Sequence, residues 1–268
     1  MFELVRMQVT GSQLNEICKM ASLEGKSAST EKTERLFNDV VMEVMSNNSI
    51  QIYQKDKVGS VTTKFNHLIT RTFEAGMIPI GSIEELQNYL KVYNLTDLLE
   101  LRVEESRLVI KRETPSKRNS YIPLTAENFI GSLSGAKEMW ENIEVGDSKV
   151  VNKKSGTEIK NYVDVEADVL KEVLVCGEVV KDKIYPFKLT ATDFEISVGL
   201  ENTGRIVNFP TVKKFVNGEV FLKLSNGLDN VVNNLSGGVR IYLDNNRPAI
   251  IVNNRPECKF QALLGFVK

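Results

Sequence analysis

The residue types that carry most enzyme chemistry are scarce in this sequence. The single histidine, His67, stands in a strand pattern beside Phe65 and Leu68, so we interpret it as a packed or solvent-facing strand residue. Ser134, between Gly131 and Gly135, imitates a nucleophile elbow, but no strong strand pattern precedes it and the order of serine and histidine does not fit. Carboxylates are frequent but stand singly along predicted helices, which is typical of solvated surfaces. The sequence therefore predicts a protein that is not an enzyme.

Motifs for cofactors and metals are also missing. There is no phosphate-binding loop of the G-x-x-x-x-G-K-[S/T] type and no G-x-G-x-x-G pattern. No two cysteine or histidine residues have the spacing of a zinc site. Cys18, Cys176 and Cys258 are widely separated, which favours small buried residues in a reducing compartment over a disulfide framework. We therefore expect no cofactor and no metal.

Composition is that of a globular protein. The chain has 268 residues, 42% hydrophobic and 26% charged, enough for one large domain or two of about 130 residues each. No apolar run approaches the roughly 20 residues of a membrane-spanning helix, and residues 1–6 do not open a secretory signal. The formal net charge of −1 neither indicates nor excludes a local basic surface. We expect a cytoplasmic protein without a membrane partner, associated with the nucleoid or, if viral, located in the host cell interior.

The hydrophobic pattern predicts the same order of elements twice. A strand at 2–9 leads into a helix at 13–23, and a second helix begins at Ser82 with the acids Glu84 and Glu85 in its first turn. The other strands of this half are predicted at 40–45, 50–54, 61–68, 71–80, 98–104, 107–112 and 120–124. In the second half a strand at 158–165 precedes a helix at 166–180, and Ser225 caps another helix. Its other strands are predicted at 185–190, 194–199, 205–209, 220–224 and in the last 30 or so residues.

This repeated order predicts the fold class. Two helices per half, each with one apolar stripe, can cover only one face of a sheet. We therefore expect an α+β protein of two tandem similar domains, each with two helices packed on curved antiparallel sheets. The domains are predicted at 1–125 and 158–268. The connector at 126–157 is interrupted by glycines and has a short helical turn near Ala136–Trp140.

Three stretches, 2–22, 78–113 and 224–268, resemble the sliding clamps of the proliferating-cell-nuclear-antigen type. They match the order of the first strand and helix, the second helix with its hairpin, and the last helix with the C-terminal strands. The resemblance implies a homotrimeric ring around double-stranded DNA that serves as a DNA polymerase processivity factor and is placed on DNA by a clamp loader. Two other classes stay open: a β-rich structural or adaptor protein, for example viral, without a DNA-encircling role, and an enzyme with unrecognised motifs.

The resemblance also implies DNA contacts on the helices. Non-specific contact to phosphates would be made by Lys19, Lys26, Lys91, Lys171, Lys181 and Lys183. The sequence departs from the family here, because acids stand beside Lys19, Lys91 and Lys171, and the fourth helix carries mainly asparagines, Asn230, Asn233 and Asn234, as polar residues. We therefore expect weak, water-mediated contact to DNA, or dependence on a loading partner.

Two protein interfaces follow from the same resemblance. Subunits would join through edge strands, with Tyr121, Ile122 and Leu124 of one chain against Ile206, Val207 and Phe209 of the next. Partner proteins would insert a short peptide into an apolar pocket. Its predicted residues are Val58, Phe129, Ile130, Leu133, Pro248, Ile250, Leu264, Phe266 and Val267. We expect a charge at Leu264 to impair partner binding and to leave the ring intact; the alternative is that the tail only packs on the sheet.

Overall fold

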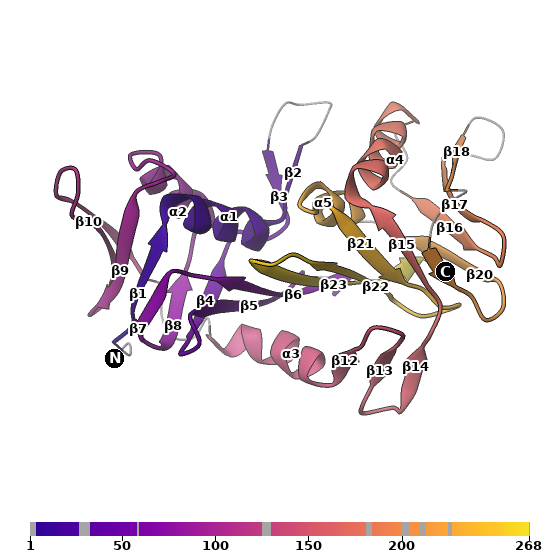
Figure 1. Cartoon of the computed structure of the whole chain (residues 1–268), viewed down its shortest axis with the longest axis horizontal. Helices are drawn as coiled ribbons and strands as arrows, with labels where there is room; N and C mark the ends of the chain where they lie inside the picture. Colours follow the sequence, from indigo (N-terminus) through magenta and orange to yellow (C-terminus); the bar gives the residue numbers. More distant parts are fainter. Residues whose placement is uncertain are drawn as a thin grey trace.

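A strand–helix–strands–helix–strands order occurs in both halves of the chain, as the hydrophobic pattern predicts (Figure 1). The computed structural model describes residues 4–26, 33–57, 59–124, 130–180, 184–199, 204–209, 213–224 and 227–267. The first half contains β1 (Arg6–Thr10), α1 (Gly11–Ser22), β2 (Glu24–Lys26), β3 (Thr33–Arg35), β4 (Val40–Met45), β5 (Ser49–Lys55), β6 (Val61–Leu68), β7 (Arg71–Glu74), β8 (Gly76–Ile80), α2 (Ile83–Leu90), β9 (Leu98–Glu104), β10 (Arg107–Arg112) and β11 (Arg118–Pro123).

The second half begins after a connecting segment that has secondary structure of its own. This connector consists of α3 (Ile130–Glu141), β12 (Ile143–Val145), β13 (Val150–Asn152) and β14 (Thr157–Ile159). The second half contains β15 (Tyr162–Glu166), α4 (Ala167–Val180), β16 (Tyr185–Leu189), β17 (Phe194–Val198), β18 (Arg205–Asn208), β19 (Lys213–Phe215), β20 (Val220–Leu224), α5 (Leu228–Asn233), β21 (Gly238–Tyr242), β22 (Ala249–Asn254), β23 (Cys258–Leu264) and β24 (Phe266–Val267).

One nine-stranded antiparallel sheet joins the two halves, and we call it the bridging sheet. Its order is β19-β15-β21-β22-β23-β6-β5-β4-β8. At the seam β23 pairs with β6 in a register that runs from Cys258 opposite His67 to Leu264 opposite Val61. Each half adds a five-stranded sheet, with the orders β11-β10-β9-β1-β7 and β18-β17-β16-β20-β24. The largest hydrophobic cluster of the described residues consequently runs through both halves.

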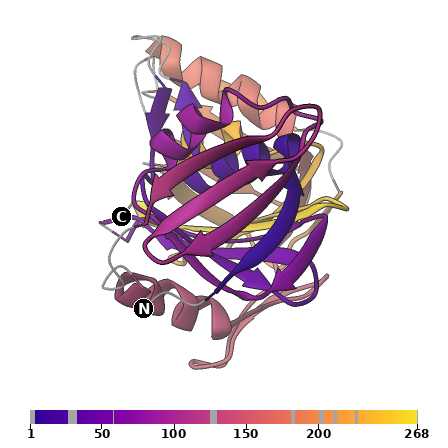
Figure 2. The same ribbon diagram turned by 90° about the vertical axis from the view of Figure 1, so that its left-hand side faces the viewer.

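The helices α1, α2, α4 and α5 lie along one side of the molecule, at the top of Figure 1. The connector lies on the opposite side of the bridging sheet, as the second view also shows (Figure 2). Strand β6 is contacted by α1 on one face and by α3 on the other. The sheet is therefore covered on both sides, which explains why its strands carry apolar residues on both faces.

Helix ends and stripes follow from local sequence. Thr10 is the N-cap of α1 and forms a capping box with Gln13, and the Ser82 hydroxyl accepts from Glu85 N at the start of α2. The predicted apolar stripes of α1, α2 and α5 are buried. Ser225, the predicted cap of α5, lies outside the described residues, and the structure begins that helix after Gly227. In the part of the chain that the structure describes, no helix is long and apolar enough to cross a membrane.

The connector differs most from the sequence prediction. A short helical turn was expected near Ala136–Trp140, whereas α3 has 12 residues and is followed by a three-stranded sheet. The strand expected at 158–165 is divided between β14 and β15. Ala136 and Trp140 are each 1% exposed against the bridging sheet, so tertiary contact supplies the stabilisation that the glycine-rich local sequence lacks.

Candidate functional surfaces

The side formed by α1, α2, α4 and α5 holds some of the predicted DNA-contacting lysines. Lys19 on α1 and Lys91 at the end of α2 are exposed. Lys171 on α4 is half-buried and forms an ion pair with Asp168, with the Nζ–Oδ1 distance at 3.1 Å. Lys26 ends β2, but its side chain is outside the description, and Lys181 and Lys183 lie outside the described residues.

Acidic side chains share this surface with the lysines. Glu84 and Glu85 are exposed in the first turn of α2, and Asp168 and Glu172 are exposed on α4. The described part of the helical surface is thus mixed in charge, and any attraction for a phosphate backbone must come from a few separate lysines.

The asparagines of α5 make contacts between the two halves. Asn230 donates from Nδ2 to the Leu23 carbonyl at 2.9 Å, and Asn234 donates to the Glu24 carbonyl at 2.9 Å. Leu23 ends α1 in the left-handed conformation, with φ 45°. The amides therefore satisfy carbonyls at the end of α1, a role that the polar stripe of α5 alone did not reveal.

The two predicted subunit edges lie at opposite ends of the chain's sheets. Strand β11 is the last strand of one five-stranded sheet, and β18 is the last described strand of the other. Tyr121 on β11 is 47% exposed and Ile206 on β18 is 64% exposed. Ile122 and Phe209 are buried in the core of their own chain, while Leu124 and Val207 are partly buried. Tyr121 and Ile206 are thus the exposed side chains of the predicted set, and the Arg107 guanidinium lies over the Tyr121 ring, 4.7 Å from its centroid.

Further exposed apolar residues lie beside each edge. The Val92 carbonyl accepts a hydrogen bond from Arg118 of β11 at 2.6 Å, and both Val92 and Leu95 are at least half exposed. At the other end, the Arg205 guanidinium lies 3.9 Å from the Cys176 sulfur, which places β18 next to α4 and its 59%-exposed Val175. Each end of the molecule therefore combines apolar surface with a strand that has no further neighbour among the described residues, the features of an association surface.

The C-terminal run is not a free tail. Leu264 is fully buried in β23, between β22 and β6, and Gly265 N donates to the Ser60 carbonyl at 2.7 Å. Phe266 and Val267 form β24, which pairs with β20 and leaves both side chains half-buried. The structure therefore does not support the expectation that a charge at Leu264 leaves the ring intact, because this side chain lies in the core and does not line a pocket.

The other predicted pocket residues divide into three groups. Pro248 is partly exposed at the start of β22, whereas Ile250 is 3% exposed because the connector sheet covers it. Val58 and Phe129 lie outside the described residues. Ile130 and Leu133 belong to α3, but their side chains are outside the description. The connector thus packs on apolar residues of the bridging sheet, such as Ile250 and Leu263, whereas the tail pairs with β20 of another sheet and Phe266 packs on the main core.

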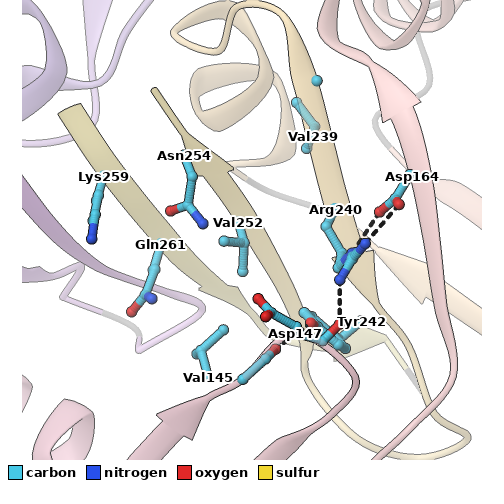
Figure 3. Close-up of a pocket in the computed structure, with 12 residues that line it drawn as sticks. Val145, Asp147, Asp164, Val239, Arg240, Tyr242, Val252, Asn254, Lys259 and Gln261 are labelled. Atoms are coloured by element: carbon cyan, nitrogen blue, oxygen red, sulfur yellow. Dashed lines mark hydrogen bonds and ion pairs between the residues drawn. The ribbon is translucent and has the colours of Figure 1, made fainter. Parts of the chain in front are cut away.

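A groove of about 500 Å³ remains between the β12–β13 turn and the bridging sheet (Figure 3). Its floor includes Tyr242 and Val252, and Lys259, Gln261 and Asn254 stand along one side. On the other side Arg240 binds both oxygens of Asp164, at 2.6 and 2.7 Å, and donates to the Asp147 carbonyl. The hydrogen bonds to Asp164 raise the pKa of Arg240, and the bond from Arg240 to the Asp147 carbonyl connects this ion pair to the turn. Sequence reasoning did not identify this groove.

His67 belongs to a charged cluster between the two halves. Its Nδ1 lies 2.6 Å from the Leu68 carbonyl and its Nε2 lies 3.3 Å from Glu16 Oε2. Arg255, from the β22–β23 turn, binds Glu16 Oε1 at 2.6 Å. The histidine is 1% exposed, which confirms the packed interpretation. The contacts of His67 and Arg255 with Glu16 link α1, β6 and the second half at one point.

This cluster predicts a dependence of stability on pH. Burial opposes ionisation of Glu16, but bonds from Arg255 and His67 hold the pKa of its carboxyl below the usual value. A lowered pKa gives stability that is present above the unfolded-state value of about 4.3 and is lost as pH falls through the folded-state value. We expect the urea midpoint to fall between pH 6 and pH 3 by more in the wild type than in Glu16→Gln. Glu257→Gln, which removes a more exposed carboxylate from the same arginine, serves as the control, and equal slopes in wild type and Glu16→Gln would contradict the prediction.

Comparison with known proteins finds similarity in structure alone. No family model matches the sequence. No curated protein matches it either. Proliferating cell nuclear antigen (PCNA) from Entamoeba histolytica superposes with a TM-score of 0.73 and 9% identity, over 98% of this chain and 99% of that one. A. fulgidus PCNA, in a structure bound to the C-terminal region of FEN-1, gives a TM-score of 0.74 and 13% identity, over 98% of both chains. The chain therefore has the PCNA clamp fold over its full length, and the predicted α+β fold class is confirmed.

Proposed function

We propose that this protein is a DNA sliding clamp: a homotrimeric ring that encircles duplex DNA and tethers a DNA polymerase and other partners, without chemistry of its own. The observation that carries the proposal is the pair of edge strands, β11 and β18, each without a further neighbour in the described part of a chain that has the PCNA fold. Because the two edges differ, association is head-to-tail, and head-to-tail contacts form a ring when the rotation closes.

The mixed charge of the helical side fits a ring that holds DNA by enclosure. A closed ring needs only weak, sequence-independent contacts to phosphates, since its residence does not depend on affinity. In the proposed function Lys19, Lys91 and Lys171 make such contacts, together with Lys26, Lys181 and Lys183. A clamp loader opens the ring. Partners dock on the side opposite the helices, near the tail and the connector.

Topological retention tests this function without a cognate polymerase. The protein is incubated with a linear duplex biotinylated at both ends, and streptavidin is then added to block the ends. We expect protein that has threaded onto the duplex to stay bound through a high-salt wash, and to leave an identical duplex with free ends. Equal loss from both duplexes, by a protein that is trimeric in solution, would contradict encirclement.

The lysines predict the salt dependence of DNA binding. Reversing Lys19, Lys91 and Lys171 to glutamate should flatten the slope of log affinity against log salt by about 0.9 for each phosphate that is no longer neutralised. The measurement is fluorescence anisotropy of a labelled duplex over a salt series. Lys223→Glu is the matched control, because this exposed lysine lies on β20, away from the helices. An unchanged slope in the triple variant would assign the three lysines to solvated surface only.

A further inference from the structure

Helix α3 is seated on the bridging sheet through one aromatic side chain. Trp140 packs with Ala136 against Tyr53 of β5, and Leu263 of β23 borders the same cluster. Trp140 is 1% exposed and is the only tryptophan in the chain. We call the contact surface for Trp140 on the bridging sheet, formed by Tyr53 and Leu263, the seat. The seat combines residues from both halves of the protein, and it adjoins Ile250, one of the residues predicted for the docking pocket.

Among the described side chains of α3, few polar contacts hold the helix on the sheet. In the described part of α3, the link to the sheet is the ion pair of Lys137 Nζ with Glu43 Oε1, at 3.0 Å. The Trp140 indole Nε1 is buried and has no hydrogen-bond partner among the described residues. An unpaired buried donor weakens the seated state, because the same group would be hydrogen-bonded to water when released.

The rest of the connector is held much more firmly. Tyr242 donates from its hydroxyl to the Gly146 carbonyl at 2.6 Å, and Arg247 donates to the Glu158 carbonyl at 2.7 Å. Bonds from Lys149 and Lys160 also lower the pKa of Glu158 to about 2, so this carboxylate stays ionised in the connector sheet. Release of α3 therefore does not require release of β12–β14.

The sequence of α3 also makes it a poor helix on its own. It has 12 residues, near the lower limit for an isolated helix, and it includes Gly131 and Gly135. A Cβ added at Gly135 would meet nothing within 4 Å, so close packing does not require a glycine there. A helix former at this position would stabilise the seated helix without changing its contacts.

We propose that α3 is a displaceable cover over the partner-docking face, and that a partner's helical segment binds by taking its place. The seat selects a large aromatic side chain for the site of Trp140. Three positions before it, Glu43 selects a basic residue, as it now holds Lys137. The partner chemistry is therefore a helical segment of the form basic-x-x-aromatic. The proposal rests on the clamp function above, since it concerns how the docking side of that clamp is opened.

The test uses the segment itself as the probe. In one variant residues 130–141 are replaced by a glycine–serine linker of equal length, which leaves the seat empty. A fluorescein-labelled peptide of residues 130–141 is then titrated into this variant and into the wild type. We expect at least tenfold tighter binding to the linker variant, and at least tenfold weaker binding when the peptide carries Trp140→Ala. A linker variant that is folded and binds the two peptides equally, or not at all, would overturn the proposal.

A measurement on the intact wild type covers the case in which the linker variant fails to fold. Hydrogen exchange should be at least tenfold faster for amides 136–141 than for those of β13, and Gly135→Ala should slow it selectively. Equal protection of the two segments would also overturn the cover. Neither readout needs DNA or a ring. Peptide binding without retention on DNA therefore removes the clamp function alone, and retention on DNA without peptide binding removes the cover alone.

Discussion

Replacing Ile206 with glutamate is expected to convert the proposed trimer to monomers. Ile206 is 64% exposed on β18, and in a head-to-tail ring this strand lies against β11 of the next chain. A carboxylate there would have to lose its hydration inside an apolar contact. The contact between β18 and β11 of the next chain would also lose its apolar anchor, the Ile206 side chain. We expect association to weaken at least 100-fold, or about 3 kcal/mol for each interface. Analytical ultracentrifugation over a concentration series measures it.

A matched control separates the edge from general surface effects. Phe221 is 54% exposed, but it lies on β20, which has a neighbouring strand on each side. Phe221→Glu makes a comparable apolar-to-acid change and should leave the mass of the particle unchanged. Tyr121→Glu, on the opposite edge, should reproduce the effect of Ile206→Glu. A trimer that survives both edge substitutions would show that the subunits meet elsewhere.

Local pattern was sufficient to predict the helices α1, α2, α4 and α5 of the two halves, whereas the strand expected at 71–80 is divided between β7 and β8, which lie in different sheets. The stripe of α1, Leu14, Ile17, Cys18 and Ala21, is buried as its spacing predicts, and Ser82 caps α2. These features depend on residues within a few positions of one another, so the sequence carries them directly. The fold class followed from their repeated order.

The candidate sites were harder to predict, because they depend on pairings between distant segments. Strand β23 pairs with β6, nearly two hundred residues earlier in the chain, and the hydrophobic pattern of neither strand identifies the other as its partner. The same pairing places Arg255 beside Glu16 and His67. For the connector, glycines correctly predicted weak local preference, but the seat that stabilises α3 is formed by Tyr53 and Leu263, far away in the chain.

Replacing Leu264 with aspartate is expected to destabilise the folded chain severely. The side chain is fully buried, and β23 is the strand through which the two halves share one sheet. A carboxylate at this point would be buried without a partner and would interrupt the core of both halves. We expect the free energy of unfolding to fall by about 4 kcal/mol or more. Urea denaturation followed by circular dichroism measures the loss.

A substitution in the neighbouring tail provides the control for this prediction. Val267→Asp places the same charge three residues later, on β24, where the side chain is only half-buried. Its cost should stay below about 1 kcal/mol, because a partly exposed carboxylate keeps much of its hydration. If the two variants were equally stable, β23 would not be the strand that joins the halves. A large difference instead means that substitutions at Leu264 report on folding, so the role of the tail in docking must be tested at Phe266 and Val267.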